Sequence, residues 1–511
     1  MHGDVSPPPL AGHLMTDWQI KPSDLKGYPH FDPVISTADA TAYASDAQTV
    51  TAHTFYPFML YEERWNRFAD KDQKGKSKSR PIRYGARRDA YIFTRYRHIL
   101  SQAYEAALSA NGLTENVLAY RRIPTSDGRG GKCNIHFAKD AFDAVERLKN
   151  CAAVAIDISR FFESLDHGLL KDAWQNLLGL ARLSSDHFAV FKAITTYSFV
   201  DRQAVYERLG HYGPKRKSKN GKDIMGYLTP YKDVPKQLCT GKQFRQKISG
   251  GPEGSIVKKN FKTHGIPQGS PMSDVLANIY MMEFDLEIKA DIEACGGVYF
   301  RYSDDVFIVV PGGEVEARFW IEKCQIAITK YGAKLKIKEE KAVAHVFSDD
   351  PKGGLNCTRV HGTQGGNGLE YLGFRFDGKR VYLRDATLSN LYRKVAMAAR
   401  RDANEAARRY PDRSSSQLKE KFDYNRLIAR FGRVEEFAEH SKDYTKWTFW
   451  TYAQKAAEVF GTKNRSILGQ LRRHRDRIRA RADLEIDRAV TGRTRRAEAK
   501  AEALKSASPS R

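Results

Sequence analysis

The sequence VYFRYSDDVFIVV (298–310) decides the fold that we expect for this chain. Two short apolar strands flank Ser303, Asp304 and Asp305, a pattern that predicts a β-hairpin with two carboxylates at its tip. Acidic turns are common, so the pair taken alone is better interpreted as a solvated hairpin tip. The meaning of the turn therefore depends on the sequence around it.

A strand with a lone carboxylate precedes the hairpin. In CAAVAIDIS (151–159), period-two geometry places Asp157 on a face of small residues, opposite three branched apolar side chains. Adding a nucleotide to a chain is a displacement at phosphorus that two divalent ions about 3.5–4 Å apart stabilise. Such ions need hard oxygen ligands on rigid elements, and Asp157, Asp304 and Asp305 would supply three carboxylates.

A glycine-rich loop, in HGIPQGSPMSDVLANIY (264–280), comes one helix length before the hairpin. Its Gly-Ile-Pro-Gln-Gly turn permits close backbone approach without side-chain bulk, which suits a surface for a nucleotide and its template base. A plain turn before a helix is the alternative. Ser270 and Pro271 predict the start of that helix, which we expect to run to Gly296 and Gly297.

A basic strand and a basic amphipathic helix are predicted upstream, at SKSRPIRY (77–84) and at 86–108. Arg80 and Arg83 are predicted to share a strand face, where bidentate guanidinium groups suit phosphate oxygens. Arg87 is predicted to be a surface or template contact. A solvated basic face is the alternative for each of these arginines.

Composition narrows the class of protein. The chain has 85 Lys and Arg against 61 Asp and Glu, and its net charge of +24 predicts a polyanionic partner, first of all nucleic acid. With 41% hydrophobic and 11% aromatic residues, it is less polar than typical ribosomal or chromatin binders, which favours an enzyme. Six scattered cysteines without zinc or redox spacing predict a reducing cytoplasm. The absence of a signal-like start and of 18 consecutive apolar residues predicts a soluble, unsecreted protein without a membrane partner.

The order of these motifs resembles the reverse transcriptases of prokaryotes, from about Arg80 to Phe376. The resemblance implies an α+β right-hand polymerase with fingers, a palm built on an antiparallel sheet with flanking helices, and an all-helical thumb. It implies two Mg²⁺ ions, with Mn²⁺ as a substitute, and dNTPs, RNA and a DNA product as partners. The implied metal ligands are Asp157, Ile158, Asp304 and Asp305.

The resemblance also implies further site residues. Phe162 occupies the position of the aromatic residue that blocks a ribose 2′-OH, which predicts selection of deoxynucleotides; core packing is the alternative, and we expect it for Phe161. Lys341 matches a late palm lysine that could assist the pyrophosphate leaving group, although such a lysine is ordinarily solvent-facing. The implied nucleotide-binding residues are Arg80, Arg83, Phe162, Gln268, Gly269 and Lys341. The implied template or primer contacts are Tyr302, Tyr371, Leu372 and Gly373, with core packing as the alternative for Tyr371 and the expected role of Phe374.

The length of 511 residues predicts about two to four units. The expected divisions are a loosely held N-terminal arm (1–50), fingers (51–150), a palm (151–384) with a basic insertion (200–264), a helical thumb (385–490) and a basic, disordered tail (491–511).

Among prokaryotic reverse transcriptases, the chain is most similar to the abortive-infection and defence-associated enzymes. The similarity lies in RRDAYIFTRYR (87–97), VLAYRR (117–122), KQFRQKI (242–248) and WTFWTY (447–452). It implies protection against phage, with synthesis either copied from a partner non-coding RNA or made with little templating from a protein hydroxyl; a homo-oligomer stays open. A group II intron- or retron-like enzyme with another role is the alternative, although no Cys pairing of the nuclease kind occurs and the retron Val-Thr-Gly motif occurs only at 490–492.

Two other classes stay open at this point. An inactive polymerase fold that only binds nucleic acid predicts a missing metal ligand, and none of the three carboxylates is missing. An RNA-copying RNA polymerase is disfavoured by Phe162 and by Ser303, where a Gly-Asp-Asp turn is expected.

Overall fold

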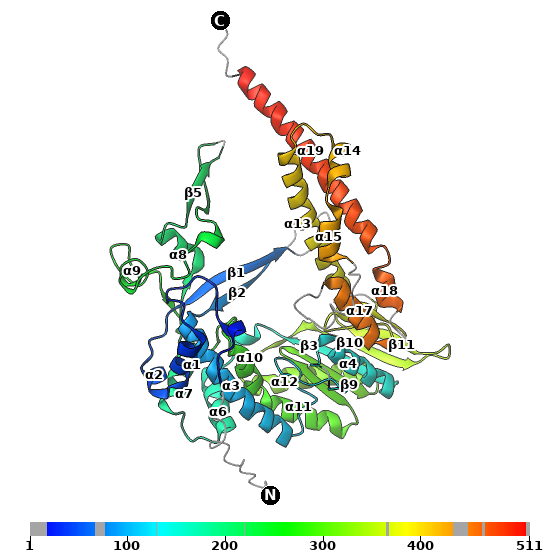
Figure 1. The fold of residues 1–511 in the computed structure, drawn as a ribbon. Coiled ribbons are helices and arrows are strands. Elements are labelled where there is room, and N and C mark those ends of the chain that lie inside the picture. The colour runs from blue at the N-terminus through cyan, green and yellow to red at the C-terminus, as the bar shows by residue number, and fades with distance from the viewer. Residues whose placement is uncertain are drawn as a thin grey trace.

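The computed structural model describes most of the chain and shows the expected α+β architecture (Figure 1). The described residues are 18–66, 77–128, 130–218, 220–363, 367–432, 448–461 and 465–506. Among them, no helix is both long enough and apolar enough to cross a membrane. All six cysteines are free thiols.

A five-stranded antiparallel sheet, which we call the palm sheet, lies at the centre. Its strands, in spatial order, are β11 (Leu355–His361), β10 (Ile337–Asp349), β3 (Cys151–Ile158), β9 (Asp305–Pro311) and β8 (Val298–Tyr302). Helices pack on both faces, and they include α4 (Asn134–Leu148), α10 (Ser273–Tyr280), α11 (Met282–Ala294) and α12 (Glu314–Lys330). Both predicted hairpin strands and the strand of Asp157 are therefore confirmed.

The alternation predicted for β3 decides how the two faces of the palm sheet are filled. Val154, Ile156 and Ile158 join the hydrophobic cluster that contains α10, α11 and α12. Ala153 joins a second cluster, which contains α4 and the small sheet β12 (Leu369–Tyr371), β13 (Phe374–Phe376) and β14 (Val381–Leu383). Asp157 shares the face of Ala153, so it lies on the side with small residues, as period two requires.

The helix predicted from Ser270 begins later and is broken. Residues 268–272 form turns, α10 starts at Ser273, and Met281 separates it from α11. Ser270 and Pro271 therefore form part of the loop instead of capping the helix. The helix thus begins two residues after the start that Ser270 as cap and Pro271 as first helical residue predict.

A second sheet, which we call the fingers sheet, has the strand order β2-β1-β4-β7. β1 (Phe58–Asn66) pairs antiparallel with β2 (Ser77–Tyr84) and parallel with β4 (Ser198–Asp201), which in turn pairs with β7 (Lys258–Lys259). The predicted basic strand and the helix α3 (Arg87–Ala110) are confirmed.

The segment expected as an insertion instead completes the fingers. It contributes β4, β7, α8 (Arg202–Arg208), α9 (Gly241–Lys247) and the hairpin of β5 (Tyr212–Lys217) and β6 (Asp223–Tyr227). Its own cluster of buried side chains includes Phe31 and Met59 from the N-terminal part of the chain. The polar, lysine-rich composition of the segment favoured an insertion. The pairing of β4 with β1 could not be predicted from local sequence, because it spans more than a hundred residues.

The N-terminal arm is packed from residue 18 onward, which corrects the expectation of a loose arm. It forms α1 (Thr37–Ser45) and α2 (Ala47–Ala52), and the side chains of Ala40 and Val50 are fully buried. Arg87 is also fully buried and forms an ion pair with Asp32 at 3.1 Å. Arg87 therefore fixes the arm to α3 and is neither a surface nor a template contact.

The C-terminal region is helical, as predicted. It comprises α13 (Asp385–Arg409), α14 (Ser415–Lys421), α15 (Tyr424–Phe431), α17 (Phe449–Val459), α18 (Arg465–Gln470) and α19 (His474–Ser506). α13 and α19 pack along each other through alanines and branched residues. Because α19 continues to Ser506, the tail is helical over most of the range expected to be disordered. Residues 433–447 of the aromatic-rich segment lie outside the described residues.

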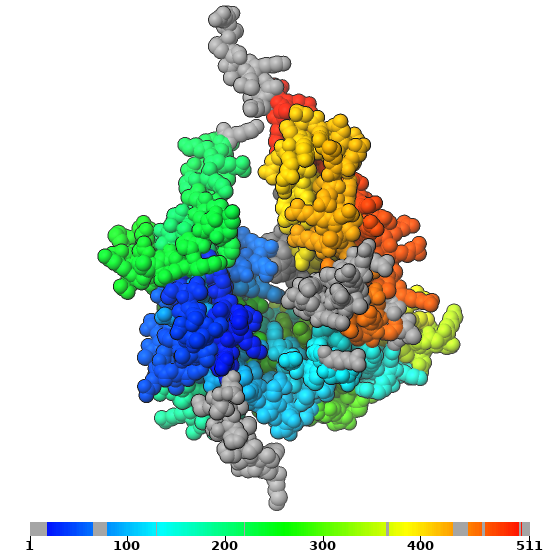
Figure 2. Space-filling model, viewed as in Figure 1, coloured from blue at the N-terminus to red at the C-terminus, as the bar shows by residue number. Residues whose placement is uncertain are grey.

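The fingers, the palm sheet and the C-terminal helices lie around a hollow. Figure 1 shows α13, α14 and α19 on one side and α8 and β5 on the other, with β1 and β2 reaching between them. In Figure 2 the surface is hollowed between these two columns.

Candidate active site

The acidic hairpin places its carboxylates against Asp157. β3 and β9 are neighbours in the palm sheet, and Asp157 lies directly opposite Asp305 in their register. The Ile158 N–H donates to the Asp304 carbonyl oxygen at 2.9 Å, so the end of β3 is tied to the tip of the hairpin. Ser303 has a φ of 61°, a left-handed conformation that closes the tight turn. The three predicted carboxylates are thus brought together.

Crowding of these carboxylates changes their proton affinity. Burial, followed by the charges of Asp304 and Asp157, raises the pKa of Asp305 to about 7. The pKa of Asp304 is also raised, first by burial and then by the charge of Asp157. A cluster of partly buried anions is destabilised unless a cation lies among them. The site therefore favours the binding of positive charge.

Lys341 supplies a positive charge to the cluster. Its Nζ contacts Asp157 Oδ1, and both side chains are about one-third exposed. The donor chemistry of the carboxylates fits a hard divalent ion. Across the described residues, however, no group of three His, Cys, Asp or Glu side chains is arranged as a complete metal site. The assignment of Asp157, Ile158, Asp304 and Asp305 as metal ligands therefore stays a prediction, and ion binding would require Lys341 to release Asp157.

A fully buried ion pair supports the acidic turn from below. Arg301 donates from Nε and Nη2 to the two carboxylate oxygens of Asp285, each at 2.6 Å, and both side chains are 0% exposed. Arg301 Nη1 also donates to the Ser303 carbonyl oxygen at 3.0 Å. The turn is therefore held by a charged group that is itself fixed from α11.

This support extends to the neighbouring segments. Asn278 Oδ1 accepts from Arg301 Nη1 at 3.1 Å, and the Tyr299 hydroxyl donates to Asp285 at 2.6 Å. On the outer side, the Tyr120 hydroxyl lies 2.9 Å from Ser303 Oγ. Sequence reasoning placed Tyr120 in the fingers but missed Asn278, Tyr299, Asp285 and Arg301. A signal existed, because an arginine in the middle of the apolar strand VYFRY needs a buried acidic partner.

Phe162 and the glycine-rich loop form one continuous wall. The Phe162 carbonyl accepts from the Ile266 N–H at 2.8 Å. Phe161 is buried in the core, as expected, whereas Phe162 is only partly buried and packs at the edge of the same cluster. An exposed edge is what a side chain that meets a ribose requires.

The same loop joins the palm to the fingers. The Arg83 N–H donates to the Gln268 carbonyl oxygen at 2.8 Å. Gly269 has a φ of +114°, and a Cβ there would lie 2.8 Å from the Arg83 carbonyl oxygen. The backbone group that approaches the loop closely is therefore β2, and contact of the loop with a nucleotide stays a prediction.

Arg80 and Arg83 do not share a strand face, which corrects the sequence expectation. β2 pairs with β1 without a register shift, so residues three apart lie on opposite faces. The Arg83 guanidinium lies over the rings of Tyr197 and Phe199, at 5.6 and 5.4 Å from the centroids. Its Nε and Nη1 are buried and lack a hydrogen-bond partner within the described part of the chain. Arg80 is exposed.

The predicted primer-contact hairpin forms between β12 and β13. Leu372 (φ 44°) and Gly373 (φ 93°) make its turn. Tyr371 is 4% exposed, and its ring centroid lies 4.4 Å from that of Phe307 on β9. Tyr371 and Phe374 are therefore core residues, and any strand contact in this hairpin falls to Leu372 and Gly373. Tyr302 is half-buried beside Phe137.

An antiparallel palm sheet with one carboxylate on an inner strand and two at the adjacent hairpin is the arrangement of a nucleotide-adding polymerase. Residues 234–376 match the family model described as reverse transcriptase (RNA-dependent DNA polymerase). The match covers less than a third of the chain, and this segment, which is similar to a reverse transcriptase, lies within a fold of antiparallel sheets followed by helices. The match includes Gln268, Asp304 and Lys341, whereas Asp157 and Phe162 precede it.

Comparison with solved structures finds telomerases at low similarity. Apo telomerase from Candida tropicalis is 11% identical with a TM-score of 0.37, over 86% of this chain and 63% of that one. Telomerase from Candida albicans in complex with a TWJ fragment of telomeric RNA is 10% identical with a TM-score of 0.36, over 86% and 67%. The chain spans 61% of the length of another Candida tropicalis telomerase, which is truncated from its C-terminal domain. None of the curated proteins matches the chain.

Proposed function

We propose that this chain is a reverse transcriptase that adds deoxynucleotides to a DNA strand with the help of two Mg²⁺ ions. The observation that carries the proposal is the position of Asp157 directly opposite Asp305, with Asp304 at the adjoining turn. Bound divalent ions would supply charge stabilisation for the attacking and leaving oxygens. The chain's own contribution is to hold three carboxylates on rigid strands above the buried Arg301.

Other side chains have positions suited to the nucleotide. The unpartnered buried N–H groups of Arg83 can donate to triphosphate oxygens, because guanidinium geometry matches them. Lys341 lies at Asp157, close to where a leaving pyrophosphate would need a proton or a cation. Phe162 meets the sugar from the edge of the core. Gln268 and Gly269 position β2 against this wall.

Primer extension tests the proposal. The wild-type chain is expected to extend a primer on an RNA template with Mg²⁺ and dNTPs, with Mn²⁺ as a weaker substitute, whereas Asp304→Ala should lose at least about a thousandfold in rate because charge stabilisation is lost. Asp291→Ala, which removes an exposed carboxylate from α11, is the control and should retain activity. Equal product from Asp304→Ala, or none from the wild type, would contradict catalysis and favour a nucleic-acid-binding fold.

Sugar selection tests Phe162 separately. Phe162→Ala should lower the preference for dNTPs over NTPs by on the order of tenfold to a hundredfold, because the space for a 2′-OH is opened. Phe161→Ala is the matched control, since its ring is buried in the core. It should reduce stability by about 3–5 kcal/mol and leave the ratio of kcat/KM values unchanged. An unchanged ratio in Phe162→Ala removes the assignment.

We further propose that the enzyme acts in the bacterial cytoplasm in defence against phage. The support is the similarity of its fingers and C-terminal motifs to defence-associated reverse transcriptases. The template would be a partner non-coding RNA. Sequencing the nucleic acid that co-purifies with the protein tests this: one bound RNA whose complement appears in the DNA product supports it. Homopolymeric DNA attached to protein would replace it with protein-primed synthesis.

A further inference from the structure

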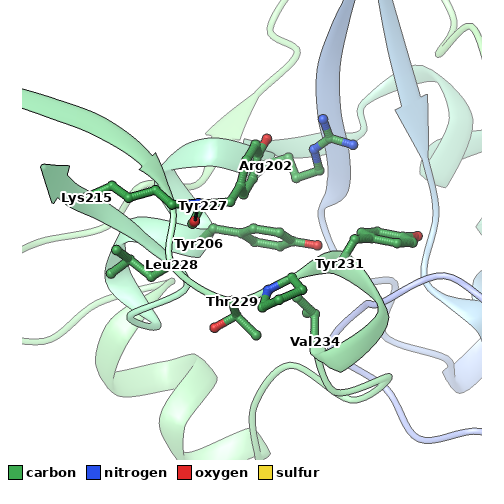
Figure 3. A pocket seen from close by; sticks show the side chains of 9 residues that line it. Arg202, Tyr206, Lys215, Tyr227, Leu228, Thr229, Tyr231 and Val234 are labelled. Carbon is green, nitrogen blue, oxygen red and sulfur yellow. Dashed lines mark hydrogen bonds between the residues drawn. The ribbon is translucent and has the colours of Figure 1, made fainter. Parts of the chain in front are cut away.

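A pocket outside the active site lies in the fingers, between α8, the β5–β6 hairpin and the loop that follows it (Figure 3). We call it the tyrosine pocket, and its walls include Arg202, Tyr206, Lys215, Tyr227, Tyr231 and Val234. Its volume of about 420 Å³ falls within the roughly 300–1,000 Å³ usual for small-ligand sites. It is therefore large enough for one nucleotide.

The floor of the tyrosine pocket carries an unsatisfied polar group. Tyr206 is 2% exposed, and its buried hydroxyl has no hydrogen-bond partner among the described residues. Figure 3 shows its ring extending across the pocket toward Tyr231. Because a buried hydroxyl without a partner is unfavourable, this group is suited to hydrogen-bonding a ligand that enters the pocket.

The rim provides flat rings and positive charge. Tyr227 and Tyr231 are 44% and 61% exposed, although aromatic side chains are usually well buried. The Arg202 guanidinium lies 4.7 Å from the centroid of the Tyr61 ring, and Lys215 Nζ donates to the Tyr227 carbonyl oxygen at 3.1 Å. Within the described chain, neither cation forms an ion pair with a carboxylate. Exposed rings beside unneutralised cations favour a base with its phosphate.

The pocket is connected to the glycine-rich loop through the fingers sheet. Tyr61, which contacts Arg202, pairs with Ile82 in the register of β1 and β2. The backbone N–H of the next residue of β2, Arg83, donates to the Gln268 carbonyl oxygen of the glycine-rich loop. A single strand that leaves the palm along β1 and β2 would therefore reach the tyrosine pocket.

We propose that the tyrosine pocket binds an unpaired nucleobase of a single strand, stacked on Tyr227 or Tyr231, with its phosphate at Arg202 and Lys215. The identification of that strand as the template or its RNA extension rests on the proposed function. RNA and DNA share the base and the phosphate, so the experiment compares both. A duplex offers no unpaired base and gains nothing from this pocket.

Fluorescence anisotropy with a short labelled oligouridylate tests the proposal. The full-length Tyr231→Ala/Arg202→Gln variant should bind the RNA on the order of tenfold more weakly than wild type at fixed salt, because one stacking platform and one cation are lost. Tyr206→Phe removes only the hydroxyl and should weaken binding about threefold. Oligothymidylate reports on DNA, and the affinity for a blunt duplex should stay within twofold.

The matched control is Phe319→Ala/Arg318→Gln on α12, which also removes one exposed aromatic ring and one exposed cation. It should leave RNA binding unchanged. If the control and the pocket variant weaken binding equally, net charge explains the loss and the pocket is not a site. Unchanged RNA affinity in both pocket variants overturns the proposal and leaves a protein partner as the occupant to seek.

The catalytic proposal and the pocket proposal can each be contradicted without the other. The Asp304→Ala chain should bind oligouridylate as wild type does, since its pocket is intact. A chain that never extends a primer but loses RNA affinity in Tyr206→Phe supports the pocket and contradicts only catalysis. Normal extension together with pocket variants that bind RNA like wild type contradicts only the pocket.

Discussion

The acidic turn and the tyrosine pocket are held by opposite physical means. Beneath the turn, Arg301 and Asp285 are completely enclosed, and their hydrogen bonds fix the backbone of Ser303. At the pocket, Tyr227 and Tyr231 are exposed and only the floor is buried. Chemistry at phosphorus needs ligands fixed within about 0.5 Å, whereas binding of a flexible strand tolerates movable rings. The proposed catalytic site thus rests on an enclosed ion pair, and the proposed binding pocket consists of exposed rings above a buried floor.

The largest effect is expected from breaking the buried pair. Asp285→Ala leaves the Arg301 guanidinium buried without its partner, which costs about 3–5 kcal/mol. We expect the free energy of unfolding, measured in urea, to fall by this amount and primer extension to be lost. The RNA affinity of the tyrosine pocket, measured under conditions where the variant is folded, should not change.

Asp291→Ala provides the control from the same helix. Asp291 pairs with Lys323 at 2.9 Å, but its side chain is 42% exposed, so the loss should be below about 1 kcal/mol. If Asp285→Ala were as mild as Asp291→Ala, the buried pair would not be what fixes the turn.

A smaller effect is expected at the joint between the two regions. Gly269→Ala places a Cβ 2.8 Å from the Arg83 carbonyl oxygen at a φ of +114°, so β2 must move away from the loop. The expected cost is about 1–3 kcal/mol, with a raised KM for dNTPs because Arg83 is displaced. Steady-state primer extension and urea unfolding measure the two changes.

Gly353→Ala is the control that separates the cost of the positive φ from the cost of the contact between Cβ and the backbone. Gly353 has a φ of +92°, but a Cβ there would meet nothing within 4 Å. It should therefore cost some stability and leave the KM for dNTPs unchanged. Equal KM values in both variants would mean that the contact of β2 with the loop does not position the nucleotide.

Local patterns predicted the parts of the site that depend on neighbouring residues. Period two placed Asp157 on the correct face of β3, and the apolar strands around Asp304 gave the hairpin with its bounds nearly unchanged. The order of motifs then brought these segments together through the family resemblance. Short-range geometry is sufficient for such features because side-chain direction follows directly from strand periodicity.

Features that depend on distant partners could not be predicted. The burial of Arg87 requires Asp32, and the pairing of β4 with β1 requires a parallel contact across the sequence. A basic residue on an amphipathic helix ordinarily faces solvent, so composition alone favoured the wrong answer for Arg87. The opposite faces of Arg80 and Arg83, by contrast, follow from a spacing of three on a strand and were within reach of the sequence.

The smallest expected change in stability, and one of opposite sign, is at the carboxylate cluster itself. Because the pKa of Asp305 is raised to about 7 from an ordinary 3.8, folding disfavours its charged form, and this cost grows as the pH rises from about 4 to about 7. Asp305→Asn should therefore raise Tm by a few degrees at pH 7.5 without divalent ions, while abolishing extension. At pH 5 the wild-type carboxyl is mostly protonated, so the difference in Tm should shrink.

Added Mg²⁺ should stabilise the wild type more at pH 7.5 than at pH 5, because cations bind the ionised cluster. It should stabilise Asp305→Asn less than the wild type. Scanning calorimetry at both pH values, with and without Mg²⁺, measures each of these changes in Tm. A Tm for Asp305→Asn below that of wild type at pH 7.5 would show that the carboxylate is already neutralised within the chain, by the nearby cations Arg384 and Lys341.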